Sequence, residues 1–167
     1  VTFLMHLGDL TLTTPFLYVL RKAAPDAHIA YLVDEKLKDV VLHNPNIDEV
    51  LTIDKKGKDN SIKALCKAAD IISEKKFDVL INLHPVKVGF SHFLFRPFLT
   101  KITRLNRKMH AADMYVDVLA QLGVKDLSNN GLEIFPGDDD KKTANDFWQE
   151  QHIAADYKLI GFNIGSA

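Results

Sequence analysis

The sequence has a single cysteine, Cys66, and no long hydrophobic run. One cysteine excludes an intrachain disulfide, a zinc site built on cysteines and a C-x-x-C redox pair, and it fits a reducing compartment. No apolar stretch approaches the ~18 residues that span a bilayer, and the apolar run at the N-terminus is shorter than the core of a signal peptide. We therefore expect a soluble, cytoplasmic protein.

Three familiar motifs are also missing. No G-x-G-x-x-G follows the first apolar run, and no G-x-x-x-x-G-K-[ST] occurs, so neither a dinucleotide fingerprint nor a P-loop is indicated. A G-x-S-x-G elbow is absent too, because Gly165-Ser166 is not followed by a second glycine. Serine hydrolase chemistry is therefore disfavoured, and any nucleotide must be bound by another device.

Net charge is low, at −1, which argues against binding nucleic acid through overall charge. One region nevertheless has only basic charges: between His84 and Ala112 there is no Asp or Glu, and the cations are Lys87, Arg96, Lys101, Arg104, Arg107 and Lys108. Phenylalanines are interleaved with them. Two interpretations stay open: a local anion-binding surface above an apolar floor, and a solvated loop over a small satellite core.

Short apolar runs alternate with helical patterns along most of the sequence. At 167 residues and 47% hydrophobic content the chain can build one sizeable core. Strands are predicted at Val1–Met5, Ile29–Val33, Val50–Ile53, Val79–Leu83 and Leu159–Asn163. Helices are predicted over Thr14–Ala24, with Thr14 as N-cap, and over Lys36–His43, Ser61–Lys75, Ala111–Leu122 and Asp138–His152. This order predicts an α/β fold with an open parallel sheet and crossover helices on both faces.

Gly8-Asp9 stands where the first predicted strand ends and the chain approaches the first predicted helix. Ligands of open α/β sheets bind at the carboxyl ends of the strands, so Asp9 is a candidate base. The alternative is that Asp9 only stabilises the helix start. His84 follows the fourth predicted strand at the same edge of the sheet, and His110 stands at a predicted helix start, where an imidazole could donate to an anion.

Two acidic groupings could suggest a metal. His110, Asp113 and Asp117 share one helix face, but a polar face opposite an apolar stripe explains that spacing better. The run Asp138-Asp139-Asp140 is typical of charge at a helix N-terminus. We expect no metal cofactor.

Several segments, in order, resemble the amino-terminal half of family 9 glycosyltransferases, the ADP-heptose:lipopolysaccharide heptosyltransferases. They are LGDLTLTTPFLYVLRKAAPDAHIAYLV from Leu7, NPNIDEVLTID from Asn44, FDVLINLH from Phe77, HAADMYVDVLAQLG from His110 and GFNIGSA from Gly161. The series extends over nearly the whole chain. The resemblance implies a GT-B arrangement, in which two Rossmann-like domains face a cleft. Residues 1–158 would be the acceptor-binding domain and residues 159–167 the start of the donor-binding domain.

By that resemblance Asp9 is the general base that deprotonates an acceptor hydroxyl during inverting transfer of heptose from ADP-heptose, a contribution of roughly 10²–10⁴-fold. The acceptor would be the anionic inner core of lipopolysaccharide, contacted by Gly8, His84, Arg104, Arg107, Lys108 and His110. Gly165 and Ser166 would begin the donor site. Peripheral contact with the inner face of the cytoplasmic membrane follows from a lipid-anchored acceptor, and the fragment alone would be inactive.

A competing interpretation is a non-catalytic α/β binding module, such as a receiver-like signalling domain with Asp54 at the end of the third predicted strand. Receivers need a cluster of carboxylates, and Asp9 alone matches that pattern poorly. Magnesium-dependent phosphorylation of Asp54 would favour this alternative.

Overall fold

The structure is a computed structural model that describes residues 1, 6–54, 69–83, 108–152, 158 and 160. The chain divides into two compact units, Val1–Phe135 and Pro136–Ala167, each of which is described by itself. The predicted assignment of residues 1–158 and 159–167 to two domains remains a prediction.

A short parallel sheet forms the centre of the first unit. Strand β1 (Ala30–Asp34) pairs in parallel with β2 (Glu49–Ile53), with Ala30 opposite Glu49 and Asp34 opposite Ile53. Every residue of β1 is buried, as expected for a strand whose two faces are both covered. Both strands therefore confirm the sequence prediction to within one residue at each end.

The second edge of β1 is occupied by Val1. The amine nitrogen of Val1 donates to the carbonyl oxygen of Ala30 at 2.7 Å, and the amide of Leu32 donates to the carbonyl of Val1 at 2.8 Å. This is the slanted bonding pattern of a parallel pair. Val1, β1 and β2 thus lie side by side in that order, a neighbour relation that also occurs among the first three strands of doubly wound α/β sheets.

The rest of the predicted sheet is not shown as a sheet. Asn82 forms only a single bridge, and the side chains of Val79 and Leu80 are 68% and 47% exposed, so the described residues do not support a full strand over Val79–Leu83. The other predicted strand positions, 2–5 and most of 159–163, lie outside the described residues. What the structure supports is a mixed α/β fold with a parallel sheet of two strands.

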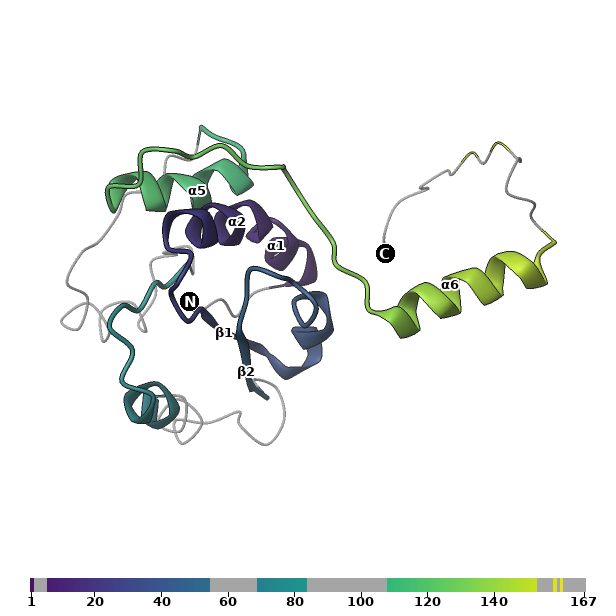
Figure 1. Ribbon diagram of the computed structural model, residues 1–167, viewed down its shortest axis with the longest axis horizontal. Helices are drawn as coiled ribbons and strands as arrows, with labels where there is room; N and C mark the ends of the chain where they lie inside the picture. The colour runs from purple at the N-terminus through teal and green to yellow at the C-terminus, as the bar shows by residue number, and fades with distance from the viewer. Residues whose placement is uncertain (2–5, 55–68, 84–107, 153–157, 159, 161–167) are drawn as a thin grey trace. The chain divides into compact units, whose positions relative to one another are not determined.

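Apolar side chains alternate between the two faces of β1, and helices cover both. Tyr31 and Val33 face the larger core cluster, which includes buried residues of α2 (Thr14–Ala23) and α5 (Ala111–Gln121). Leu32 faces the other way and packs with Ile53 and with Ile72 from a helical segment at residues 69–74. Helix α5 packs against α2 (Figure 1). Among the described residues, helical segments thus pack on both faces of β1, whereas the predicted full sheet is not shown.

The helices begin and end close to their predicted bounds. Pro15 stands in the first turn of α2, but the N-cap is Thr13 and not Thr14. The reason is that the hydroxyl of Thr13 donates to the Leu10 carbonyl at 2.7 Å, so the chain is already turned one residue earlier. After β1 the chain forms a 3₁₀ helix, η1 (Glu35–Val40), where a short helix was predicted.

A buried hydroxyl pair anchors α2 to the sheet. The oxygens of Thr13 Oγ1 and Tyr31 Oη lie 2.9 Å apart, and neither side chain is exposed. Because the one proton of Thr13 goes to the Leu10 carbonyl, Tyr31 must be the donor in this pair. Burial raises the pKa of the Tyr31 phenol, so it remains a neutral donor.

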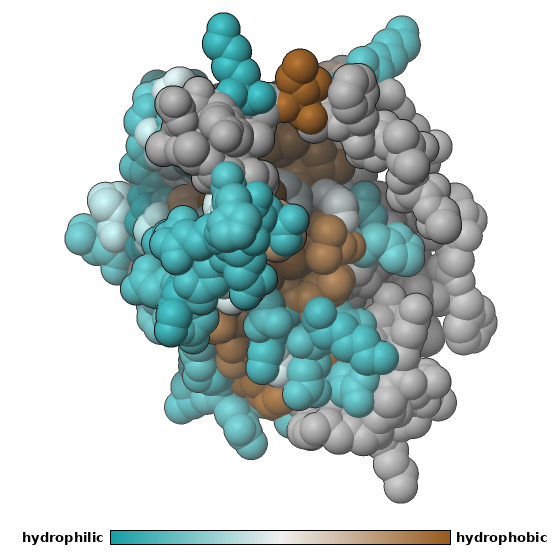
Figure 2. Space-filling view, turned by 90° about the vertical axis from the view of Figure 1, so that its right-hand side faces the viewer, coloured by the Kyte–Doolittle hydropathy of each residue, from teal (hydrophilic) through white to brown (hydrophobic). Residues whose placement is uncertain are grey.

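The second unit contains helix α6 (Asp138–Glu150), close to its predicted range. The carboxylate of Asp140 accepts from the Gly137 amide at 2.8 Å, so the acidic run caps the helix start, as predicted. No residue of α6 is buried. Hydrophobic side chains also reach the surface elsewhere, between hydrophilic ones (Figure 2). Within the described part of the chain, no helix has the length and apolarity needed to cross a bilayer.

Candidate active site

Asp9 lies in a short helix that the sequence analysis did not predict. Residues Leu7–Thr11 form α1, a helix of five residues in which Asp9 belongs to the first turn. The Leu10 amide donates to the His6 carbonyl at 3.0 Å, and Leu10 is 1% exposed in the core. Packing of Leu10 therefore anchors this short helix to the core, while the neighbouring Asp9 is only partly buried. Residues 2–5 of the predicted strand before it lie outside the described residues, so the strand-end position of Asp9 stays a prediction.

The Asp9 side chain is partly buried and has no hydrogen bond or ion pair with any other described residue. A carboxylate without a cation beside it keeps its lone pairs for another group. This is the arrangement that a general base requires, since a paired carboxylate would first have to break its ion pair. The alternative role of Asp9, a favourable charge at a helix start, is compatible with the same position.

Tyr115 from α5 lies near enough to Asp9 for the carboxylate charge to act on its phenol. Burial raises the pKa of the Tyr115 phenol, and the nearby Asp9 charge raises it further. Tyr115 is 5% exposed and belongs to the core cluster. Sequence analysis missed this neighbour, because only the tertiary packing of α5 near α1 brings the two residues together. In the sequence, only its position five residues after the candidate residue His110 could have drawn attention to Tyr115.

His110 is the N-cap of α5, as predicted. Its Nδ1 atom accepts from the Ala112 amide at 3.3 Å. A ring nitrogen that accepts carries no proton, so the neutral imidazole has its proton on Nε2. His110 and Lys108 are both exposed. An exposed Nε2–H at the start of α5 is a suitable donor to an anionic ligand.

The acidic residues that follow His110 on α5 do not assemble into a metal site. The Asp117 carboxylate accepts from Gln121 Nε2 at 2.6 Å, and Asp113 is exposed in the first turn. In the described ranges, no group of three or more His, Cys, Asp or Glu side chains is arranged to hold a metal ion.

Gly8 precedes Asp9 in α1, and its backbone does not require glycine. Its φ is not in the left-handed region, and a Cβ built on it would meet no described atom within 4 Å. Alanine is the better helix former at such a position. Space for a close ligand beside Asp9 would account for the glycine, whereas the fold of the described residues does not.

The remaining predicted site residues lie outside the described residues. They are His84, Arg104 and Arg107 on the acceptor side, and Gly165 and Ser166 on the donor side. The structure therefore brings together Asp9 and Tyr115, and it places His110 and Lys108 at the start of the helix that carries Tyr115. The roles of all these residues in binding remain predictions.

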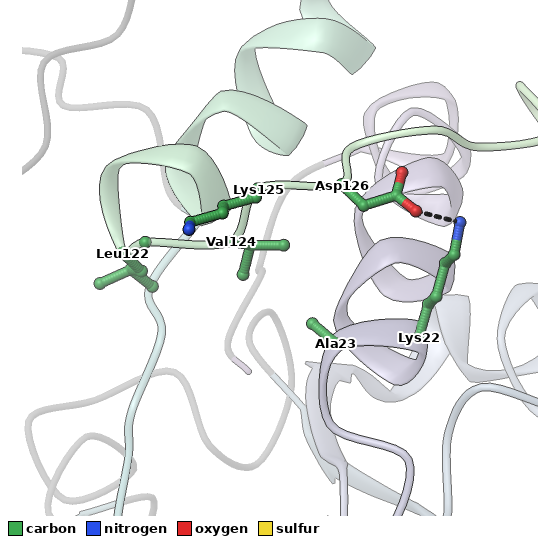
Figure 3. Close-up of a pocket in the computed structure, with 7 residues that line it drawn as sticks. Lys22, Ala23, Leu122, Val124, Lys125 and Asp126 are labelled. Carbon is green, nitrogen blue, oxygen red and sulfur yellow. Dashed lines mark ion pairs between the residues drawn. The ribbon is translucent and has the colours of Figure 1, made fainter.

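One surface depression lies away from Asp9 and His110 in the described residues. A depression of about 500 Å³ lies between the C-terminal ends of α2 and α5 and is lined by Lys22, Ala23 and residues 122–126 (Figure 3). Lys22 Nζ lies 2.7 Å from Asp126 Oδ2, and this contact raises the pKa of Lys22 and lowers that of Asp126. Since His110 and Tyr115 lie toward the other end of α5, we do not assign the active site to this depression.

Comparisons with known proteins give one informative result. No protein-family model matches the chain, and no curated protein matches it. Among solved structures, the crystal structure of the glycosyl transferase family 9 from Veillonella parvula DSM 2008 matches with a TM-score of 0.90 and 54% sequence identity. The match covers 99% of this chain and 53% of that chain, so this chain spans about half the length of its relative. Over nearly its whole length, the chain is therefore similar to part of a family 9 glycosyl transferase.

Proposed function

We propose that this chain is the acceptor-side part of an inverting glycosyltransferase, which transfers heptose from ADP-heptose to the inner core of lipopolysaccharide. The observation that carries the proposal is the 54% identity to a family 9 glycosyl transferase over 99% of the chain. The similarity to this structure directly supports glycosyl transfer as the general reaction. Heptose, ADP and lipopolysaccharide rest on the ordered sequence resemblance to heptosyltransferases.

Asp9 is the proposed general base. In inverting transfer, an acceptor hydroxyl loses its proton while its oxygen forms a bond to the anomeric carbon, and the diphosphate leaves from the opposite face with the electrons of the broken bond. A carboxylate that accepts this proton must be held in place and must be free of competing cations. Asp9 meets both conditions among the described residues, because α1 is anchored by Leu10 and no described cation pairs with the carboxylate.

The proposed acceptor contacts are cationic or donating, as an anionic sugar requires. Lys108 and His110 precede and cap α5, while Arg104 and Arg107 come from the basic segment and suit bidentate pairing with carboxylate or phosphate. Gly8 would allow the acceptor to approach closely, and His84 would complete the acceptor side. Gly165 and Ser166 would begin the donor site. ADP-heptose is a substrate, and the proposed reaction uses no metal cofactor.

The lipid anchor of the proposed acceptor suggests where the protein works. We propose a cytoplasmic protein that touches the inner face of the cytoplasmic membrane without spanning it. The basic segment between His84 and Ala112 would favour an anionic surface of this kind. Nucleic acid is not a proposed partner.

The proposal is tested in a chimera, defined as the Veillonella parvula protein in which this chain replaces the region that it matches. Asp9→Asn should lower kcat for heptose transfer by about 10²–10⁴-fold, because an amide cannot accept the proton. ADP release with truncated lipopolysaccharide as acceptor measures this rate. The thermal midpoint should remain nearly unchanged, because helix-end charge contributes only ~0.3–1 kcal/mol.

Asp113→Asn is the matched control, since Asp113 occupies in α5 the first-turn position that Asp9 occupies in α1. It should alter helix-end charge equally and leave kcat unchanged. Near-normal turnover of the Asp9→Asn chimera would remove Asp9 as the base. Absence of transfer from ADP-heptose by the unsubstituted chimera, together with transfer from another nucleotide sugar, would reject heptose and retain glycosyl transfer.

A further inference from the structure

Helix α6 has an aromatic face without a partner among the described residues. Phe147 and Trp148 are 51% and 42% exposed, and their rings meet edge to face with centroids 5.2 Å apart. Ala144 lies on the same side of the helix, at spacings of three and four residues. The opposite side carries Lys142 and Gln149. The helix is therefore amphipathic, although none of its residues is buried.

An amphipathic helix of this length needs a surface to pack on. Helices shorter than ~12–15 residues are marginal in water, and most of their stability in proteins comes from a buried apolar face. The Asp140 cap supports only the first turn of the 13 residues. Aromatic rings are also the side chains that contribute most to packed interfaces. Because both Phe147 and Trp148 are exposed, we infer that a surface that would cover them is absent from the described residues.

The comparison with the Veillonella parvula protein indicates which neighbour is missing. The match covers 99% of this chain, so α6 falls within it, but it covers only 53% of the other chain. A little under half of that protein has no counterpart here. Polypeptide of that size can form a domain with its own apolar face.

We propose that the Phe147–Trp148 face of α6 docks onto the part of a complete family 9 protein that this chain lacks. The helix then belongs structurally to that part, although its sequence lies within this chain. The interface would join α6 to an apolar surface of the remaining domain. This inference concerns assembly and does not depend on heptose, on lipopolysaccharide or on the role of Asp9.

The test compares the 167-residue chain with the chimera, using two matched double variants. Phe147→Ala/Trp148→Ala removes the aromatic face, and Lys142→Ala/Gln149→Ala alters the opposite face while keeping helix propensity high. In the chimera, the aromatic variant should lower the thermal midpoint by about 5 °C or more, and the control by no more than about 1 °C. In the chain alone, neither variant should shift the midpoint by more than about 1 °C.

Two further measurements need no substitution. Trp148 is the only tryptophan of the chain, so acrylamide quenching of its fluorescence reports on α6 alone, and we expect ready quenching in the isolated chain. Hydrogen exchange of the α6 amides should slow at least tenfold in the chimera relative to the chain. These readouts remain available if the aromatic variant of the chimera fails to fold.

Three outcomes would overturn the proposal. Equal effects of the aromatic and control variants in the chimera, with no added hydrogen-exchange protection, would mean that nothing docks there. A shielded Trp148 in the isolated monomer would mean that residues of this chain cover the face. A dimer in sedimentation equilibrium that Phe147→Ala/Trp148→Ala abolishes would identify a second copy as the occupant.

Discussion

At the residue scale, one arginine holds together the two loops that lead into the sheet. Arg21 Nη2 donates to Asp48 Oδ2 at 2.5 Å, and the same carboxylate oxygen accepts from the Ile29 amide at 2.7 Å. Arg21 also donates to the carbonyl oxygens of Pro25, Ala27 and Asn46. The Arg21 guanidinium group thus joins the end of α2 to the segments that lead into β1 and β2.

The Asp48 carboxylate should make stability depend on pH. The Ile29 amide, followed by Arg21, lowers the pKa of Asp48 below its ordinary value. A group with a lowered folded pKa stabilises the protein above its unfolded pKa of about 3.9, and this contribution is lost as the pH falls through the folded pKa. Asp48→Asn should therefore reduce the free energy of unfolding at pH 7, by no more than about 1 kcal/mol because the side chain is 39% exposed.

Urea unfolding of the chain at a series of pH values measures this effect. The difference between the parent and Asp48→Asn should shrink as the pH falls below about 4. Asp39→Asn, at an exposed aspartate in η1, serves as the control. A difference that is constant from pH 7 to pH 2 would show that the Asp48 contribution comes from packing and not from charge.

At the element scale, two glycines at helix positions should respond to alanine in opposite directions. Gly123 follows the end of α5 with φ +103°, and the Val124 amide donates to the Leu119 carbonyl at 3.0 Å, the bond that closes a Schellman cap. Gly123→Ala should cost about 1 kcal/mol or more through backbone strain. Gly8→Ala should stabilise the chain by about 0.5–1 kcal/mol, because its φ is ordinary and its surroundings are open.

Chemical denaturation of both variants checks the signs, and the chimera adds a functional readout. If the acceptor passes close to α1, Gly8→Ala should raise KM for the acceptor while raising stability. Gly123 lies at the end of α5 opposite to His110, so Gly123→Ala should leave the KM for the acceptor unchanged. A Gly8→Ala chimera with unchanged KM would place the acceptor away from Gly8, whereas a destabilised one would show that α1 needs glycine for its own packing.

The elements also show which parts of the fold the sequence could predict. Helices α2, α5 and α6 have periodic apolar stripes or caps, and β1 and β2 are short β-branched runs, so each was predicted to within about two residues. Helix α1 was missed because five residues including Gly8 carry no periodic signal, and its stability comes from burying Leu10. Val79 and Leu80 have a strand-like pattern, but exposure shows that apolar composition alone does not place them in a sheet.

At the scale of the whole molecule, the candidate site divides into what spacing can predict and what only tertiary packing reveals. Asp9 and His110 could be predicted as site residues because strand ends and helix starts are recognisable in sequence. Tyr115 was not, because residues separated by about a hundred positions in the chain share no local pattern. The contact between α5 and α2 brings Tyr115 close enough for the Asp9 charge to affect its pKa.

The proposed division of the reaction between two domains leads to a final prediction. The 167-residue chain should bind a deacylated lipopolysaccharide core but release no ADP from ADP-heptose, because positioning of both substrates supplies much of the rate and the proposed donor site barely begins here. The chimera should do both, and its Asp9→Asn variant should bind without transfer. Calorimetry measures binding, and ADP release measures transfer. Turnover by the chain alone would place a donor site within residues 1–167, whereas acceptor binding by the chimera alone would move the acceptor contacts to the other domain.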